Sequence, residues 1–160
     1  MYKIVMLSAG LLLGLILARL FFFIMKVETE SMNPNLKTGE RIIVNRFVSA
    51  GKGDIVAVES PADEGRIILS RIIASEFETV EIRNRIVYIN DTAAQFSWNI
   101  KKEDSAIYPM KFTYRDNMPP VKLGKDEYFL LGDNFDSSYD SRTIGAVPEE
   151  LIEGRIIYKR

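Results

Sequence analysis

Apolar positions divide the chain into one long continuous run and a series of short segments. The long run covers residues 4–25 and is interrupted only by Ser8 and Arg19. A helix that crosses a bilayer needs about 20 such residues, so the run predicts an N-terminal transmembrane helix. The alternative is a cleaved signal peptide, but the residues that follow offer no small-x-small cleavage site. We therefore expect an anchor over 1–27 and a separate domain over 28–160.

The short segments have the composition and spacing of β-strands. Each is rich in β-branched or aromatic residues and is bounded by turn residues. The predicted strands cover 41–45, 54–58, 66–73, 79–83, 86–89, 128–131 and 155–158. Residues 91–127 are polar and contain three prolines, so we expect a loop-rich insertion there with one or two short strands. The whole pattern predicts a mostly β domain, an antiparallel barrel or sandwich.

The amino-acid composition excludes several classes of functional site. The 160 residues include no Cys and no His, and the net charge is −1. Without His there is no Ser-His-Asp triad and no His-based zinc site. The balanced charge provides no basic field for nucleic acid. We therefore expect no metal, no cofactor and no nucleic-acid partner, and any proton transfer must use Lys, Asp, Glu, Tyr or water.

Residues 29–36 follow the apolar run and form a turn rather than a continued helix, because they contain Pro34 and two Asn residues. The turn places the Ser31 hydroxyl within about 20 Å of the apolar run, close to a membrane surface. Such a serine is a nucleophile when a base and oxyanion donors lie beside it. A serine next to Asn and Pro is also typical of a turn or cap, so these residues alone leave both interpretations open.

A second polar cluster, residues 132–142, directly follows the apolar strand at 128–131. Its short polar side chains are typical of a solvated loop that caps its own backbone. They also fit a rigid platform that positions a catalytic group from a neighbouring strand. Asp133, Asp136 and Asp140 do not follow the spacing of a calcium loop, so hydrogen bonding within the loop is the better interpretation of these carboxylates.

Together, these segments resemble the type I signal peptidase family over the whole chain. After the apolar run come Ser-Met-x-Pro-x-Leu at 31–36, Gly-Asp-x-Val at 53–56, a strand ending in Arg-Ile-Ile at 71–73, GDNFDSSYDSRTIG at 132–145, and Val-Pro at 147–148. The resemblance implies a membrane-anchored serine protease with a β fold that cuts signal peptides. It also implies a single-pass protein of the cytoplasmic membrane with its C-terminal domain outside the cytoplasm. The expected partners are exported preprotein or surface-protein segments, together with membrane lipid.

The resemblance implies a role for several individual residues. Ser31 matches the nucleophile, and its backbone N–H matches an oxyanion-hole donor. Thr29 matches a hydroxyl position that assists this hole, and Ser138 matches the hydroxyl that orients the catalytic lysine. Residues that match a supporting turn and a structural ion pair are Gly132, Asp133, Asn134, Asp140 and Arg142.

One position departs from the family pattern. The family carries its general base in a Lys-Arg pair at the end of the third strand, whereas this chain has Ser70-Arg71, followed by an altered loop over 74–78. A serine hydroxyl is no base at pH 7, and a guanidinium stays protonated. The other lysines weighed as substitutes lie in polar, turn-rich segments typical of solvated amines. They are Lys37, Lys52, Lys111 and Lys122.

Two functions remain open at this stage. The first is a signal-peptidase-like serine endopeptidase in which Ser31 attacks with the help of an unconventional base. The second is a non-catalytic module that binds peptides or acts as a chaperone in secretion or in pilus and surface-protein assembly. That second role is known for lysine-lacking relatives in Gram-positive bacteria and applies here only by analogy. The variant Ser70→Lys probes this difference. If the catalytic pocket is otherwise preserved, the new lysine supplies a base and cleavage should appear or rise greatly; no gain would mean that the altered loop over 74–78 has also dismantled the site.

Overall fold

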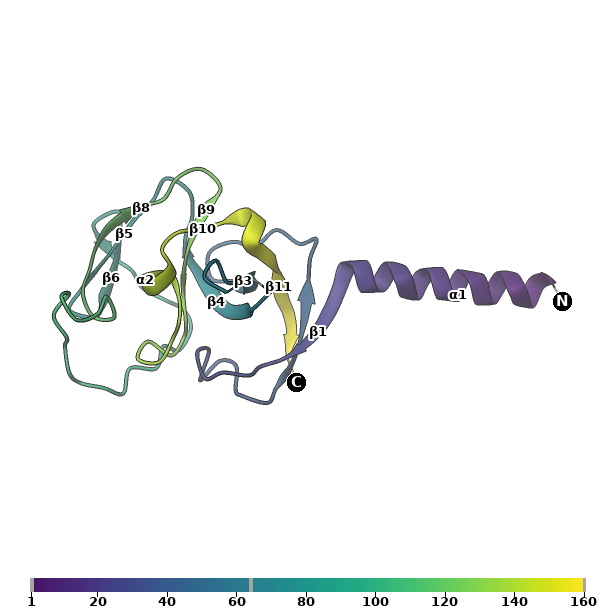
Figure 1. The fold of residues 1–160 in the computed structure, drawn as a ribbon, viewed down its shortest axis with the longest axis horizontal. Helices are drawn as coiled ribbons and strands as arrows, with labels where there is room; N and C mark the ends of the chain where they lie inside the picture. The colour runs from purple at the N-terminus through teal and green to yellow at the C-terminus, as the bar shows by residue number, and fades with distance from the viewer. Residues whose placement is uncertain (1, 64, 160) are drawn as a thin grey trace.

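The computed structural model describes residues 2–63 and 65–159 and shows one long helix that projects from a β domain (Figure 1). Helix α1 covers Tyr2–Phe21 and leads directly into strand β1, Phe22–Lys26. The next strands are β2 (Arg41–Asn45), β3 (Ile55–Glu59), β4 (Ile67–Ala74), β5 (Thr79–Arg83) and β6 (Ile86–Ile89). They are followed by β7 (Thr92–Ala93), β8 (Met118–Lys122), β9 (Glu127–Leu131), α2 (Ser141–Ile144), β10 (Val147–Pro148), a 3-10 turn (Glu149–Leu151) and β11 (Ile152–Lys159).

The strands form two antiparallel sheets. The larger has the order β1-β2-β11-β3-β4-β9-β10, and the smaller has the order β7-β6-β5-β8. The smaller sheet lies at the end of the domain away from α1 (Figure 1). The mostly β, antiparallel prediction is confirmed, and a strand is present at each of the seven predicted places. The segment 91–127 contains two short strands, β7 and β8, and otherwise consists of loops and turns up to Glu127, where β9 begins.

The apolar run ends differently from the prediction. Helix α1 stops at Phe21, and residues 22–26 pair with β2 from Phe22 opposite Asn45 to Lys26 opposite Arg41. The predicted helix over the apolar run 4–25 is therefore wrong at its C-terminal end, while the division into an anchor over 1–27 and a domain over 28–160 stays a prediction. Aromatic and β-branched side chains suit a strand once a neighbouring strand offers its backbone. Within residues 2–63 and 65–159, no helix combines the length and apolar character needed to cross a membrane.

The turn after β1 is held to the larger sheet by its own apolar side chains. Met32 and Leu36 are 0% and 1% exposed and pack in one apolar cluster with Val44 and Ala57. Burying two such side chains contributes about 1.5–3 kcal/mol each. Residue 31, between the exposed start of the turn and buried Met32, is thereby fixed at the surface of the sheet.

Candidate active site

The Ser31 hydroxyl lies against the edge of β4. Its Oγ is 2.9 Å from Thr29 Oγ1, and it donates a long hydrogen bond of 3.5 Å to the carbonyl oxygen of Leu69. Leu69 is the residue directly before Ser70, so the Ser31 hydroxyl contacts the backbone next to the second serine that the sequence singled out. Ser31 is half-buried and Thr29 is exposed, which leaves the pair of hydroxyls accessible from solvent.

The loop after β9 holds the backbone of Ser31. The amide of Asn134 donates to the Ser31 carbonyl oxygen at 2.8 Å, and Ser138 Oγ lies 3.1 Å from the same oxygen. The Ser138 hydroxyl also hydrogen-bonds to the Asn134 carbonyl. Gly132 makes this approach possible, because a Cβ there would meet the Ser138 side chain and come within 2.7 Å of the Ser31 carbonyl oxygen. The loop over 132–138 is therefore a close-fitting support for the Ser31 turn.

A buried ion pair joins this loop to β4. Arg71 donates to both carboxylate oxygens of Asp133, at 2.8 and 2.6 Å, and to the Gly53 carbonyl at 2.6 Å. Its guanidinium lies 4.6 Å from the centre of the Trp98 ring. Asp133 also accepts a hydrogen bond from Asn35 at 2.9 Å. Arg71 is thus a bidentate structural cation that ties β4, the loop and the Ser31 turn together.

A second buried ion pair, between Arg142 and Asp140, supports the same loop. Arg142 donates to the two carboxylate oxygens of Asp140 at 2.9 and 2.7 Å, and to the Phe135 carbonyl at 2.7 Å. Asp140 accepts a further bond of 3.0 Å from the Gly132 amide. Asp140 also caps the short helix α2 through the Arg142 amide. These bonds fix both ends of the loop that contacts Ser31.

Ser31 is one of the residues that line a groove of about 470 Å³. Its walls come from the β1 end, from the start of β4 and from the loop before α2. The lining residues are Met25, Lys26, Glu28, Thr29, Ser31, Gly65, Arg66, Ile67, Ile68, Leu69, Ser137 and Tyr139. Strand β4 pairs with β3 over Ile67–Arg71 but with β9 only from Arg71 onward, so Ile67–Ser70 have one edge without a partner strand among the residues described.

Comparison with known protein families identifies the family of the chain that carries this groove. The family described as "Signal peptidase, peptidase S26" matches residues 1–159. The chain belongs to the signal peptidase family.

Individual signal peptidases agree with this assignment. The chain is 34% identical to signal peptidase I of Bacillus amyloliquefaciens over 149 residues, covering 89% of this chain and 75% of that protein. It is 31% identical to signal peptidase I V of Bacillus subtilis (strain 168), covering 82% of this chain and 81% of that protein. The crystal structure of a signal peptidase I from Enterococcus faecalis V583 matches with a TM-score of 0.52 at 27% identity, covering 69% of this chain and 98% of the other. The two antiparallel sheets thus form a signal-peptidase-like fold.

Ser70 has an unusual environment for a polar residue. It is 1% exposed, and its Oγ has no hydrogen-bond partner among the described residues. Side chains alternate between the faces of a strand, so Ser70 shares a face with Ile68 and Ile72, which belong to an apolar cluster. A buried hydroxyl without a partner costs about 1–3 kcal/mol. The signal peptidase fold thus places an unsatisfied hydroxyl beside the Ser31 groove.

No lysine is hydrogen-bonded to Ser31 in the part of the chain that the structure describes. Lys52 pairs with Glu78 at 2.5 Å, and the Lys111 amine lies 4.8 Å from the centre of the Phe112 ring. The sequence reasoning missed Lys26, which is exposed and lines the groove. Its only signal was its place between the apolar run and the Ser31 turn.

The structure brings the predicted site residues of this signal peptidase homologue into one region. Ser31 contacts Thr29, Asn134 and Ser138, while Asp133 and Asp140 anchor the supporting loop. The chemical roles that the resemblance implied for these residues stay predictions. The sequence reasoning did not find the Arg71–Asp133 pair, because its two partners are distant in sequence and only the fold joins them.

Proposed function

We propose that this protein holds exported polypeptides in an extended conformation in the Ser31 groove, with the Ser31 hydroxyl beside the bond that its relatives cleave. Membership of the signal peptidase family makes signal peptides the expected substrate class. The unpaired edge of β4 at Ile67–Ser70 supports this binding mode, since an extended peptide can add to an exposed edge as a further strand. Backbone pairing gives affinity there, and the groove walls select the side chains.

The surroundings of Ser31 also support the binding of a developing negative charge. The Ser31 amide has no hydrogen-bond acceptor among the described residues, and the Thr29 hydroxyl is 2.9 Å from Ser31 Oγ. A free backbone N–H and a neighbouring hydroxyl are suitable donors for an oxyanion. The Asn134 and Ser138 bonds to the Ser31 carbonyl keep this backbone in place.

The single observation that carries the proposal is the set of hydrogen-bond partners of Ser31 Oγ. They are a hydroxyl and a carbonyl oxygen, and neither is a base at pH 7. We infer that Ser31 is positioned but not activated. Loss of a positioned base costs roughly 10²–10⁴ in rate. Where a nucleophile and its base act as one unit, the loss reaches about 10⁶.

A second candidate function is a non-catalytic binding module for secretion or for the assembly of surface proteins. The apolar surroundings of Ser70 favour it, because no group described near that side chain takes over the role of a base. In this case the groove retains its affinity for exported segments, and Ser31→Ala leaves the cellular role of the protein intact. In a working protease the same substitution abolishes that role.

We also propose that the region before the β domain attaches it to the cytoplasmic membrane, with the domain on the extracytoplasmic side. Helix α1 projects away from the domain (Figure 1). Large apolar side chains along it are 61–74% exposed: Val5, Met6, Leu7, Leu11 and Leu12. Exposed apolar surface of this kind marks a contact with lipid or protein. The protein should therefore stay in the membrane pellet during alkaline carbonate extraction, and its release would contradict this attachment.

The substitution Ser70→Lys tests the missing base directly. A lysine on this apolar wall is desolvated, which lowers the pKa of its amine and makes it a base near neutral pH. With a precursor that carries a signal peptide, we expect cleavage to rise at least about 10²-fold above the unaltered protein. Ser70→Met is the matched control, because it adds a chain of similar length without an amine and should give no rise.

The outcomes of this experiment separate the alternatives. Adding Ser31→Ala to Ser70→Lys should abolish the gained cleavage, because the nucleophile is then absent. A folded Ser70→Lys protein that gains no cleavage would show that more than the base is missing. An unaltered protein that cleaves as fast as Ser70→Lys would overturn the proposal that Ser31 is not activated.

A further inference from the structure

The loop over residues 105–114 presents an unusual number of large apolar side chains to solvent. They are 42–71% exposed and comprise Ile107, Tyr108, Met110, Phe112 and Tyr114. The same loop contains no carboxylate, and Lys111 is its single charged residue. Apolar patches of this kind mark interaction sites in soluble domains. Aromatic and methionine side chains are also the types enriched at binding surfaces.

The base of this loop is fixed by ionic contacts, so its tip is held outward. Asp116 is fully buried and accepts bonds from the Tyr108 amide at 2.8 Å and from Arg115 at 2.9 and 2.8 Å. Arg115 also bonds to Asp104 at 2.8 Å and to the Ala106 carbonyl at 2.9 Å. One guanidinium thus joins the two ends of the loop. The apolar tip is presented on a clamped base and takes no part in the core.

The loop adjoins the Ser31 groove through three consecutive residues. Ser137 and Tyr139 line the groove. Ser138, between them, lines a smaller cavity of about 140 Å³ together with Thr113, Tyr114 and Arg115. The strip 137–139 therefore separates the groove from the base of the apolar loop. A polypeptide that leaves the groove across this strip meets the cavity and then the loop.

We propose that the 105–114 loop is a second contact surface for the polypeptide held in the Ser31 groove. It takes apolar or aromatic side chains from the part of that polypeptide that has passed residues 137–139. The proposal rests on the proposed function of the groove. Ten extended residues reach about 33 Å, and a domain of this length is roughly 30–40 Å across. A tail of ten residues is therefore long enough to span from the groove to the loop.

Two observations favour a polypeptide over lipid as the occupant. The loop leads into β8, which belongs to the sheet at the end of the domain away from α1 (Figure 1). With the attachment through α1 proposed above, the membrane lies at the other end of the molecule from β8. Continuity with the groove also supplies a ligand directly, whereas lipid contact would require a second membrane-facing side.

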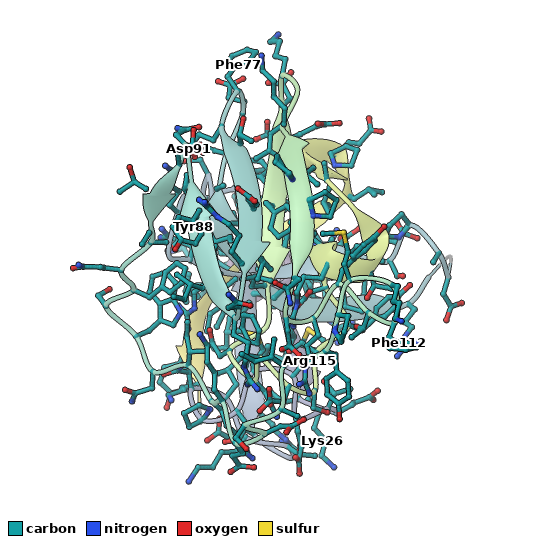
Figure 2. The ribbon with its side chains drawn as sticks, turned by 90° about the vertical axis from the view of Figure 1, so that its left-hand side faces the viewer. Lys26, Phe77, Tyr88, Asp91, Phe112 and Arg115 are labelled. Atoms are coloured by element: carbon teal, nitrogen blue, oxygen red, sulfur yellow. The ribbon has the colours of Figure 1, made fainter. Side chains whose placement is uncertain are left out.

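The chain provides a matched control for this surface. Phe77 is 63% exposed and Phe112 is 71% exposed, so both are solvent-facing phenylalanines. Figure 2 shows Phe77 at one extremity of the domain and both Phe112 and Lys26 in its opposite half. Because Lys26 lines the groove, Phe77→Ser changes an exposed aromatic far from the site.

The test compares three synthetic peptides on the full chain in lipid nanodiscs. One ends shortly after the groove-binding segment of a signal peptide. The second adds ten residues with two phenylalanines, and the third adds ten Gly and Ser residues. We expect the phenylalanine peptide to bind at least about tenfold more tightly than the other two, since burial of one aromatic side chain corresponds to that factor. The triple variant Met110→Ser/Phe112→Ser/Tyr114→Ser should remove this difference, and Phe77→Ser should retain it.

The outcomes show whether the second surface, the groove or the proposed occupant is wrong. Equal affinities of all three peptides for the unaltered protein would overturn the second surface while leaving the groove intact. Absence of binding by the shortest peptide would overturn the groove itself. A photo-crosslinker in place of Phe112 should attach to the phenylalanine peptide. Attachment to lipid or to a second copy of the chain instead would overturn the proposed occupant.

Discussion

Replacing Ser70 with alanine removes a buried hydroxyl that has no hydrogen-bond partner among the described residues. The usual result of a polar deletion in a core is lost stability. Here we expect the opposite, because the native state already carries the desolvation cost of the hydroxyl without a bond to offset it. The surrounding side chains, Ile68 and Ile72 among them, accept a methyl group without leaving any polar atom unpaired.

The magnitude follows from a second buried serine in the same protein. Ser141 is 2% exposed, and its Oγ accepts a 2.9 Å bond from the Leu130 amide. Ser141→Ala leaves that amide without a partner and should cost about 1–3 kcal/mol. Ser70→Ala should instead be neutral or stabilising by about 1 kcal/mol. The same chemical change at two buried sites should therefore differ by about 1–4 kcal/mol in the free energy of unfolding.

Thermal unfolding of the full chain in detergent measures this difference. Trp98 is the single tryptophan, and its ring lies over Arg71, so its fluorescence reports on the site region. A difference of 1 kcal/mol corresponds to about 2–4 °C in Tm for a protein of this size. Ser70→Ala should melt at or above the temperature of the unaltered protein, and Ser141→Ala should melt clearly below it. Equal losses in both variants would show that the Ser70 hydroxyl has a partner, and the reasoning about position 70 would be refuted.

Further substitutions test the parts of the site separately. Gly132→Ala should weaken precursor binding, measured by calorimetric titration, and should destabilise the domain by about 1–3 kcal/mol, because its Cβ meets Ser138 and the Ser31 carbonyl. Gly51→Ala is the control and should show neither effect, because no heavy atom lies within 4 Å of its Cβ. Arg71→Met should cost about 3–5 kcal/mol in urea unfolding, because it leaves the Asp133 carboxylate buried and unpaired; adding Asp133→Asn should recover part of the loss, and no recovery would contradict the pairing. Burial alone would raise the pKa of Asp116, but hydrogen bonds from Arg115 and the Tyr108 amide outweigh it and hold that pKa below its usual value. Stability from a carboxylate with a lowered pKa is present above its unfolded pKa of about 3.9 and is lost as pH falls through the folded value. Hydrogen exchange at the Tyr108 amide, corrected for intrinsic rates, should therefore lose protection as the pH falls below about 4, and equal protection of this amide at neutral pH in an Asp116→Asn variant would contradict the clamp.

Local sequence patterns were sufficient for most of the β domain. The hairpin of β5 and β6 matches the predicted bounds, because alternation continues on both sides of Asn84-Arg85, which adopt positive φ angles of 48° and 67°. Such φ values suit a tight hairpin turn. Strand β1 was missed, because its composition continues the apolar run and only pairing with β2 reveals a strand. Strand β8 was difficult because it carries Pro119 and Pro120, which an edge strand tolerates.

The sequence predicted the segments that form the site but not the contacts between them. The Ser31 turn and the loop over 132–142 were recognisable from their residues, and the fold brings them into contact. The pairing of Arg71 with Asp133 and the place of Lys26 in the groove depend on strand order, which no local pattern encodes. The unsatisfied Ser70 hydroxyl likewise depends on which face of β4 meets the apolar cluster.

The central claim is that Ser31 is held at a peptide groove without a base to activate it. Mass spectrometry of the unaltered protein, mixed in excess with a signal-peptide precursor and quenched over a time course, tests this claim directly. A protein with this geometry should bind the precursor and accumulate neither an acyl group on Ser31 nor the cleaved product within the time in which Ser70→Lys completes a turnover. Rapid appearance of either species in the unaltered protein, dependent on Ser31, would contradict the account.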